Sequence, residues 1–227
     1  MNNFFVTSYE RNIKFHTFRN NYQLCNDLTN KLSSIILKNN SSKKNICLCG
    51  GSTPIFLYQS LFRKKINWKQ VEIILTDERL VNEGHIKSNK KLLTDIFSKS
   101  QISQRPNILL INNTGTKTKY NIIKRIPFDF TILGMGDDGH TASIFNNKLI
   151  SNNYQSSEFA FICKKKSESY KRLSLSEQIL KKSKRTFLLI RGYSKLKLIN
   201  HALGNLENSN YPINAFLKND IEIYWCP

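Results

Sequence analysis

The sequence predicts an α/β protein built on a doubly wound, mostly parallel β-sheet with helices on both faces, a Rossmann-like arrangement. Near-continuous apolar runs rich in Ile, Leu and Phe recur along the chain, and such runs are typical of strands covered on both faces. Segments with apolar residues at spacings of three and four lie between them, as in amphipathic helices. Strands that alternate with helices indicate a parallel sheet, whose ligands bind beyond the carboxyl ends of the strands at a topological switch point.

The elements follow in order along the chain. Strands are expected at residues 46–49, 71–75, 107–111, 130–133, 159–162, 187–190 and 221–224. Helices are expected where apolar side chains share one face, namely at Cys25, Leu28, Leu32, Ile35 and Ile36, at Leu57, Tyr58, Leu61 and Phe62, at Leu92, Leu93, Ile96 and Phe97, and at Leu198, Ile199, Ala202, Leu203 and Leu206. Residues 39–45 and 112–121 are polar and are expected to be loops.

Length and composition limit the class of protein. A chain of 227 residues, 40% of them hydrophobic, suits a single domain spanning residues 1–227. The first residues lack the pattern of a signal peptide, and no stretch approaches the roughly 20 apolar residues that cross a bilayer. The five cysteines have no metal-site spacing and are expected to be buried in a reducing compartment. We therefore expect a cytoplasmic protein with no membrane partner, and we also expect a monomer.

The charge balance is strongly basic, with 35 Lys plus Arg against 16 Asp plus Glu and a formal net charge of +19. The basic residues form short clusters along the whole chain, such as residues 164–166, rather than one arm or stripe. No RNA-recognition signature or zinc-finger spacing accompanies them. We therefore expect no nucleic-acid partner and interpret the charge as a solvated surface or as a field that steers an anionic substrate.

The first candidate site segment, CGGSTP at residues 49–54, follows an expected strand. Its glycines permit a tight turn, Ser52 or Thr53 can cap the helix that follows, and Pro54 suits a first helical position. Such a turn directs unpaired N–H groups at an anion, so it predicts a phosphate site, although a plain strand-to-helix connection would have the same pattern. It lacks the GK[ST] ending of a nucleotide P-loop. Gly50, Gly51, Ser52 and Thr53 are called the glycine turn below.

Two further segments follow expected strands. TDER at residues 76–79 would be an ordinary solvated loop, except that its strand is expected to lie beside the one that carries the glycine turn. GMGDDGH at residues 134–140 is more specific, because an acid and a histidine separated by one glycine are difficult to explain by packing. Histidine ordinarily titrates near neutrality, which suits His140 to remove a proton from water. Asp138 could orient the ring or stabilise its charged form; the alternative is a capping aspartate and a loop histidine.

In this order, CGGSTP, TDERLV and LGMGDDGHTASIF resemble the 6-phosphogluconolactonases, relatives of the glucosamine-6-phosphate deaminases, and the resemblance runs through nearly the whole chain. KRLSLS at residues 171–176 and GYSK at residues 192–195 look like the family's arginine-bearing segment and its turn before the last long helix. The resemblance implies an α/β fold of the sugar-phosphate isomerase type. It also implies hydrolysis of 6-phospho-D-glucono-1,5-lactone to 6-phosphogluconate in the oxidative pentose phosphate pathway, with a small-molecule sugar phosphate as partner and no metal or cofactor.

The family's site residues carry over to this chain position by position. The resemblance implies that His140 is the catalytic base, and Asp138 is expected beside it. Contacts to the sugar phosphate are expected from Gly50, Gly51, Ser52, Thr53, Asp77, Arg79, Arg172 and Lys195.

Three other functions stay open on the sequence. The related deaminases carry a glutamate five residues after this histidine, where the present chain has Phe145. An apolar ring cannot move the proton that opens the sugar ring, so hydrolysis is favoured over deamination. A sugar-phosphate-binding relative without activity is a second alternative, which the retained His140 disfavours. A nucleic-acid-binding protein is the third and is supported by net charge alone.

Overall fold

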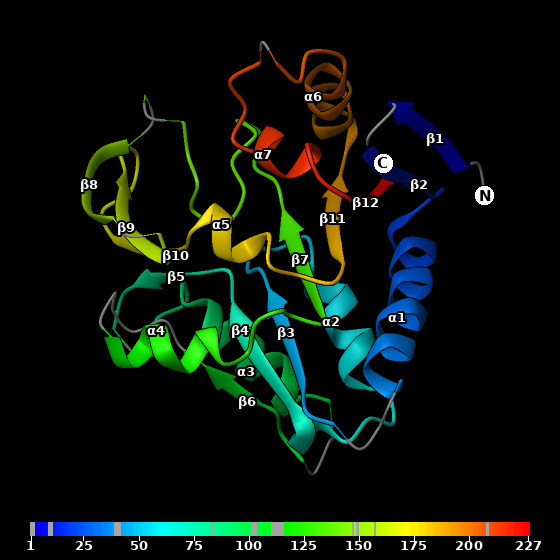
Figure 1. Ribbon diagram of the computed structural model, residues 1–227. Helices are drawn as coiled ribbons and strands as arrows, with labels where there is room; N and C mark the ends of the chain where they lie inside the picture. The colour runs from blue at the N-terminus through cyan, green and yellow to red at the C-terminus, as the bar shows by residue number, and fades with distance from the viewer. Residues whose placement is uncertain are drawn as a thin grey trace.

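The described residues form two β-sheets, with helices packed around the larger one (Figure 1). The computed structural model describes residues 3–8, 11–38, 42–82, 84–100, 104–109, 116–146, 148, 150–156, 158–207 and 209–227. In order across the larger sheet, the strands are β1 (Asn3–Ser8), β2 (Arg11–Thr17), β12 (Ile221–Cys226), β11 (Thr186–Arg191), β7 (Phe130–Gly134), β3 (Lys44–Leu48), β4 (Val71–Leu75) and β6 (Asn107–Leu109). β1 pairs antiparallel with β2, and the other pairs are parallel, which confirms the predicted sheet.

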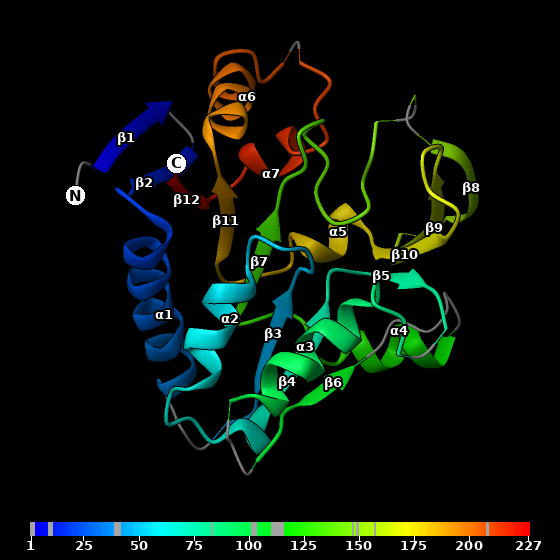
Figure 2. The ribbon, with the colours of Figure 1, turned by 180° about the vertical axis from the view of Figure 1, so that it is seen from behind.

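Helices cover both faces of this sheet. They are α1 (Asn21–Leu37), α2 (Ile55–Phe62), α3 (Asn89–Ser98), α4 (Thr116–Ile123), α5 (Glu177–Leu180), α6 (Tyr193–Gly204) and α7 (Asn214–Leu217), and a 3-10 helix spans Trp68–Gln70. Buried residues of α1, α2 and α3 form one hydrophobic cluster, on the face turned to the viewer in Figure 2. Those of α5, α6 and α7 belong to a second cluster. Ile132 of β7 packs in the first cluster and its neighbour Leu133 in the second, so the sheet is covered on both sides.

Most elements predicted from apolar patterns are confirmed. The buried side chains of α1 include Cys25, Leu28, Leu32 and Ile36, and all four predicted apolar residues of α2 are fully buried. The end of the strand predicted at residues 107–111 lies outside the described residues, as do residues 39–41 and 112–115. The loop predicted at residues 112–121 is wrong where it can be compared, because α4 begins at Thr116. Its sequence, TKTKYNII, carries few apolar residues and therefore gives little helical signal.

The second sheet is antiparallel and was not predicted from the sequence. Its strands, in order, are β5 (Asp77–Leu80), β10 (Lys171–Leu175), β9 (Ala160–Lys165) and β8 (Ile150–Ser156). The strand predicted at residues 159–162 corresponds to β9, so its assignment to the parallel sheet was wrong. The TDER segment, expected to be a loop, is mostly strand β5. These strands contain many charged and polar residues. They therefore lack the continuous apolar runs that are typical of strands covered on both faces.

The order of the strands creates a switch point between β3 and β7. From β3 the chain moves outward through β4 to β6, and it then returns to form β7 on the other side of β3. Connections diverge from this position, so the carboxyl ends of β3 and β7 border a crevice where ligands of such sheets bind. The glycine turn follows β3 directly, and the GMGDDGH segment begins at the end of β7.

The structure also bears on the cysteines and on membrane-spanning helices, for which the composition gave expectations. All five cysteines are buried and none forms a disulfide. Burial raises the pKa of the Cys49 thiol to about 12, so this group is un-ionised at neutral pH. Among the helices that the structure describes, none combines the length and apolar character needed to cross a bilayer.

Candidate active site

A cavity of about 190 Å³ opens at the switch point. The residues that the sequence singles out and that line it are Gly50, Gly51, Ser52, Thr53, Asp77, Arg79, His140, Arg172 and Lys195. Asp138 contacts His140 without lining the cavity. The fold thus gathers residues separated by more than a hundred positions into one site, as the switch-point argument predicts.

The glycine turn is held by backbone conformation. Gly51 has φ = +93°, a conformation that side chains other than glycine rarely adopt. The predicted capping by Ser52 or Thr53 is wrong, because Pro54 occupies the N-cap of α2 and no side chain caps it. The Ile55 N–H instead donates to the Ser52 carbonyl at 3.3 Å. Ser52 and Thr53 both line the cavity.

His140 and Asp138 form a tight pair after β7. The Asp138 carboxylate contacts Nδ1 of His140 and accepts the His140 backbone N–H at 3.2 Å. A β-carbon at Gly136 would lie 2.2 Å from Nδ1 of His140, so only glycine allows the ring to occupy this position. Burial raises the pKa of Asp138, but hydrogen bonds from His140 and Lys165 lower it by more than burial raises it. The pKa of Asp138 therefore lies well below its usual range. Asp138 is therefore a carboxylate at neutral pH.

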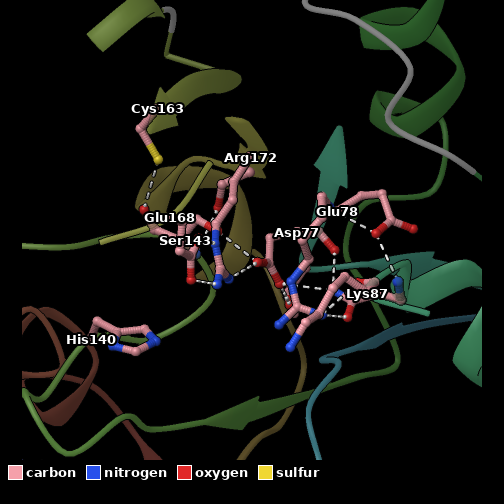
Figure 3. Close-up of polar contacts among 12 residues, drawn as sticks. Asp77, Glu78, Lys87, His140, Ser143, Cys163, Glu168 and Arg172 are labelled. Carbon is pink, nitrogen blue, oxygen red and sulfur yellow. Dashed lines mark hydrogen bonds and ion pairs between the residues drawn. The ribbon is translucent and has the colours of Figure 1, made fainter. Parts of the chain in front are cut away.

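Asp77 and Arg172 form a buried network in the wall of the same cavity. Figure 3 shows the two side chains pointing toward one another, with Arg172 Nη1 3.5 Å from Asp77 Oδ2. The same carboxylate oxygen accepts the Ser143 hydroxyl at 2.6 Å, and Arg172 Nε donates to Glu168 at 2.8 Å. Burial alone would lower the pKa of Arg172, but the two carboxylates raise it above its usual value. A permanently charged guanidinium therefore lies in the cavity wall.

Arg79 is held in place by Asn89, a residue that the sequence did not single out. Its Nη1 donates to Asn89 Oδ1 at 2.6 Å and to the Lys87 carbonyl at 2.9 Å. Asn89 Nδ2 in turn donates to the Asp77 carbonyl at 2.8 Å. Asn89 lines the cavity and is 1% exposed. It is the first residue of α3, and Ser88 caps that helix through the Lys91 N–H. A serine followed by asparagine at a predicted helix start was the available signal.

Three other contact residues were also missed. Ser143 belongs to the HTAS stretch but had no assigned role, and Glu168 lies in the turn before β10. Lys165 belongs to the lysine cluster at residues 164–166, interpreted from the sequence as solvated surface or as part of a steering field, yet its Nζ donates to Asp138 Oδ2 at 3.2 Å. These contacts depend on the second sheet, so no local pattern could reveal them.

A larger cavity, of about 740 Å³, lies at the other end of the sheet, at the amino ends of β11 and β12. Its basic lining residues are Lys14, Lys31, Lys181, Lys184, Arg185 and Lys218. Among the described residues that line it there is no histidine. In the described part of the chain, no group of three or more His, Cys, Asp or Glu is placed to ligate a metal ion. The smaller cavity is the candidate active site because it combines basic groups with a histidine–carboxylate pair.

The fold and this cavity define the class of protein: an α/β protein with a basic, histidine-containing site at the switch point of a doubly wound sheet. Residues 19–225 match the family described as glucosamine-6-phosphate isomerases/6-phosphogluconolactonase, and the chain belongs to this family. It is 30% identical over 218 residues to a 6-phosphogluconolactonase of Pseudomonas putida, covering 90% of this chain and 87% of that relative.

Two further similarities agree. A 6-phosphogluconolactonase of Haemophilus influenzae is 33% identical over 188 residues, which cover 74% of this chain and 77% of the relative. The crystal structure of a 6-phosphogluconolactonase from Shewanella baltica superposes with a TM-score of 0.79 at 26% identity, covering 94% of this chain and 97% of that one.

Proposed function

We propose that this chain hydrolyses 6-phospho-D-glucono-1,5-lactone to 6-phosphogluconate, a reaction of the oxidative pentose phosphate pathway. The family membership and the named relatives support this activity. The observation that carries the proposal is the placement of His140, backed by Asp138, in the same cavity as the glycine turn. A general base and an anion site in one cavity suit a substrate with a reactive carbonyl and a remote phosphate.

Substrate binding is proposed to begin with the phosphate. The glycine turn directs backbone N–H groups at an anion, and Lys195 in the first turn of α6 and the buried Arg172 add positive charge. Asp77 is proposed to hold Arg172 in place and to contact the sugar. Because the phosphate is remote from the reacting carbon, its binding energy fixes the orientation of the lactone beside His140.

The chemical step is proposed to use His140 as general base. Its Nδ1–H donates to the Asp138 carboxylate, which leaves Nε2 to accept a proton from water. The resulting hydroxide attacks C1 of the lactone, and the carbonyl oxygen becomes an oxyanion that backbone N–H groups or Arg79 stabilise. The C1–ring oxygen bond then breaks, and the imidazolium returns the proton to the departing ring oxygen. The proposed steps use no metal and no cofactor.

Deamination of glucosamine 6-phosphate is the nearest rival. At the position where the deaminases carry a glutamate, Phe145 is 8% exposed and its ring centre lies 4.6 Å from that of His140. A buried phenyl ring cannot take up or release a proton, so it supports the assignment of hydrolysis. Release of ammonia from glucosamine 6-phosphate at a rate comparable to lactone hydrolysis would contradict this assignment.

We further propose that residues 1–227 act as one domain and as a cytoplasmic monomer without a nucleic-acid partner. The scattering of the basic clusters along the chain supports the last point. Light scattering of the purified protein tests the monomer. A steep loss of duplex DNA affinity with added salt would contradict the absence of a nucleic-acid partner.

Hydrolysis of the lactone with and without its 6-phosphate tests the proposed function. The wild type should prefer the phosphorylated lactone strongly, and His140→Ala should lower kcat by about 10²–10⁴-fold while leaving KM nearly unchanged. The exposed His201, in the last turn of α6, provides the matched control: His201→Ala should keep wild-type kcat. An unchanged kcat in His140→Ala, after subtraction of spontaneous hydrolysis, would refute the role of His140.

A further inference from the structure

Lys165 brings an ammonium group to the His140–Asp138 pair. It is the last residue of β9, in the antiparallel sheet, and its Nζ lies 3.2 Å from Asp138 Oδ2. The other carboxylate oxygen, Oδ1, contacts Nδ1 of His140. One carboxylate is therefore shared between an ammonium group from the second sheet and an imidazole from the segment that follows β7. The side chains of all three residues are between 22% and 27% exposed, so water only partly screens their charges.

The Phe145 ring packs against both Lys165 and His140. The Lys165 Nζ lies 5.3 Å from the centre of the Phe145 ring, and the His140 ring lies against the same phenyl group. Cation–π attraction therefore holds the ammonium group beside Asp138. The buried ring also excludes water from one side of the pair, which strengthens the electrostatic interactions among the three side chains.

Other charged groups surround the pair. Those that line the cavity with His140 are Asp77, Arg79, Arg172 and Lys195, and Glu168 pairs with Arg172. The Arg172 guanidinium lies 5.5 Å from the centre of the Phe145 ring. Arg172 is held by Glu168 and Asp77, which offset its charge. Lys165 differs from it in binding the same carboxylate that contacts His140.

We propose that Lys165 is a positioning residue for the general base, anchoring Asp138 against His140 and opposing the protonation of the imidazole ring. Without a counter-charge, a carboxylate beside a histidine favours the imidazolium form, which cannot accept a proton from water. Lys165 takes up part of the charge of Asp138, so that Asp138 orients the ring without holding it protonated. The catalytic part of this inference rests on the proposed function and makes the antiparallel sheet a contributor to the reaction.

The titration of His140 tests the inference directly. The chain has four histidines, so NMR of the imidazole C–H signals can follow each one, with His140→Gln identifying its signal. Lys165→Met removes the charge and keeps an unbranched stem on Phe145, and Lys165→Gln provides a second neutral variant. Lys165→Arg restores the charge. Lys166→Gln is the matched control, because it removes the same charge from the exposed neighbouring residue.

In both neutral variants the midpoint of the His140 titration should rise by about half a unit to one unit. The acidic limb of the kcat/KM profile for the lactone should move by the same amount, and Lys165→Arg and Lys166→Gln should match the wild type. A midpoint that is unchanged or lower in the neutral variants, or that rises equally in Lys166→Gln, would overturn the inference. An inactive wild type would refute the proposed function, while the NMR titration would still decide the role of Lys165.

Discussion

Replacing Asn89 by alanine should weaken both the fold and the capture of substrate. Its amide accepts a hydrogen bond from the Arg79 guanidinium at 2.6 Å and donates one to the Asp77 carbonyl at 2.8 Å. The bond to Asp77 is buried, the bond to Arg79 is partly buried, and Asn89 itself is 1% exposed. The substitution therefore leaves a buried carbonyl without this donor and removes one of the two contacts that orient Arg79.

The magnitude follows from these two bonds. A hydrogen bond to a charged group contributes about 1.5–3 kcal/mol and a neutral one about 1 kcal/mol, so the free energy of unfolding should fall by about 3 kcal/mol. Arg79 keeps its bond to the Lys87 carbonyl, so it stays near the cavity with a less defined direction. A loss of roughly 1 kcal/mol of substrate binding corresponds to about a fivefold rise in KM.

Urea denaturation and steady-state lactone kinetics measure the two effects. Asn219→Ala is the matched control, because Asn219 donates its amide to the Ala215 carbonyl at 2.9 Å on the exposed surface. That substitution should change the free energy of unfolding by no more than about 0.5 kcal/mol. Should Asn89→Ala match Asn219→Ala in stability and keep the wild-type KM, the positioning of Arg79 by Asn89 would be wrong.

Two further predictions concern one residue in the cavity and one outside it. Lys195→Ala should raise the KM for the phosphorylated lactone and leave kcat largely intact, because a phosphate contact acts on binding; a loss confined to kcat in steady-state kinetics would contradict this role. Glu222 is partly buried, and although burial raises its pKa, hydrogen bonds from His16 and Lys31 lower it from 4.5 to about 2. A carboxylate whose pKa is lower in the folded than in the unfolded protein stabilises the fold at pH values above the unfolded pKa. Glu222 should therefore contribute up to about 3 kcal/mol at neutral pH and lose this contribution as the pH falls from about 4.5 to about 2. In urea titrations across this range, Glu222→Gln should be less stable than the wild type at pH 7 and should lose less stability on acidification; parallel curves would contradict the contribution.

The sequence by itself determined the parallel sheet and the position of the site along it. Strands buried on both faces require continuous apolar runs, and their helices require apolar residues three and four apart, so both leave a local pattern. The glycine turn and the His140 segment each follow such a strand. The rule that ligands bind at the carboxyl ends of parallel strands then places these segments in one crevice.

Only the tertiary structure decided which side chains support that site. The antiparallel sheet is built from strands whose charged residues give no periodic signal, and it brings Arg172 opposite Arg79. It also delivers Lys165 to Asp138, across 27 positions of sequence. Whether a lysine is a solvated surface charge or a partner of a catalytic pair depends on what packs against it. That is a property of long-range contacts, which no local spacing of residues records.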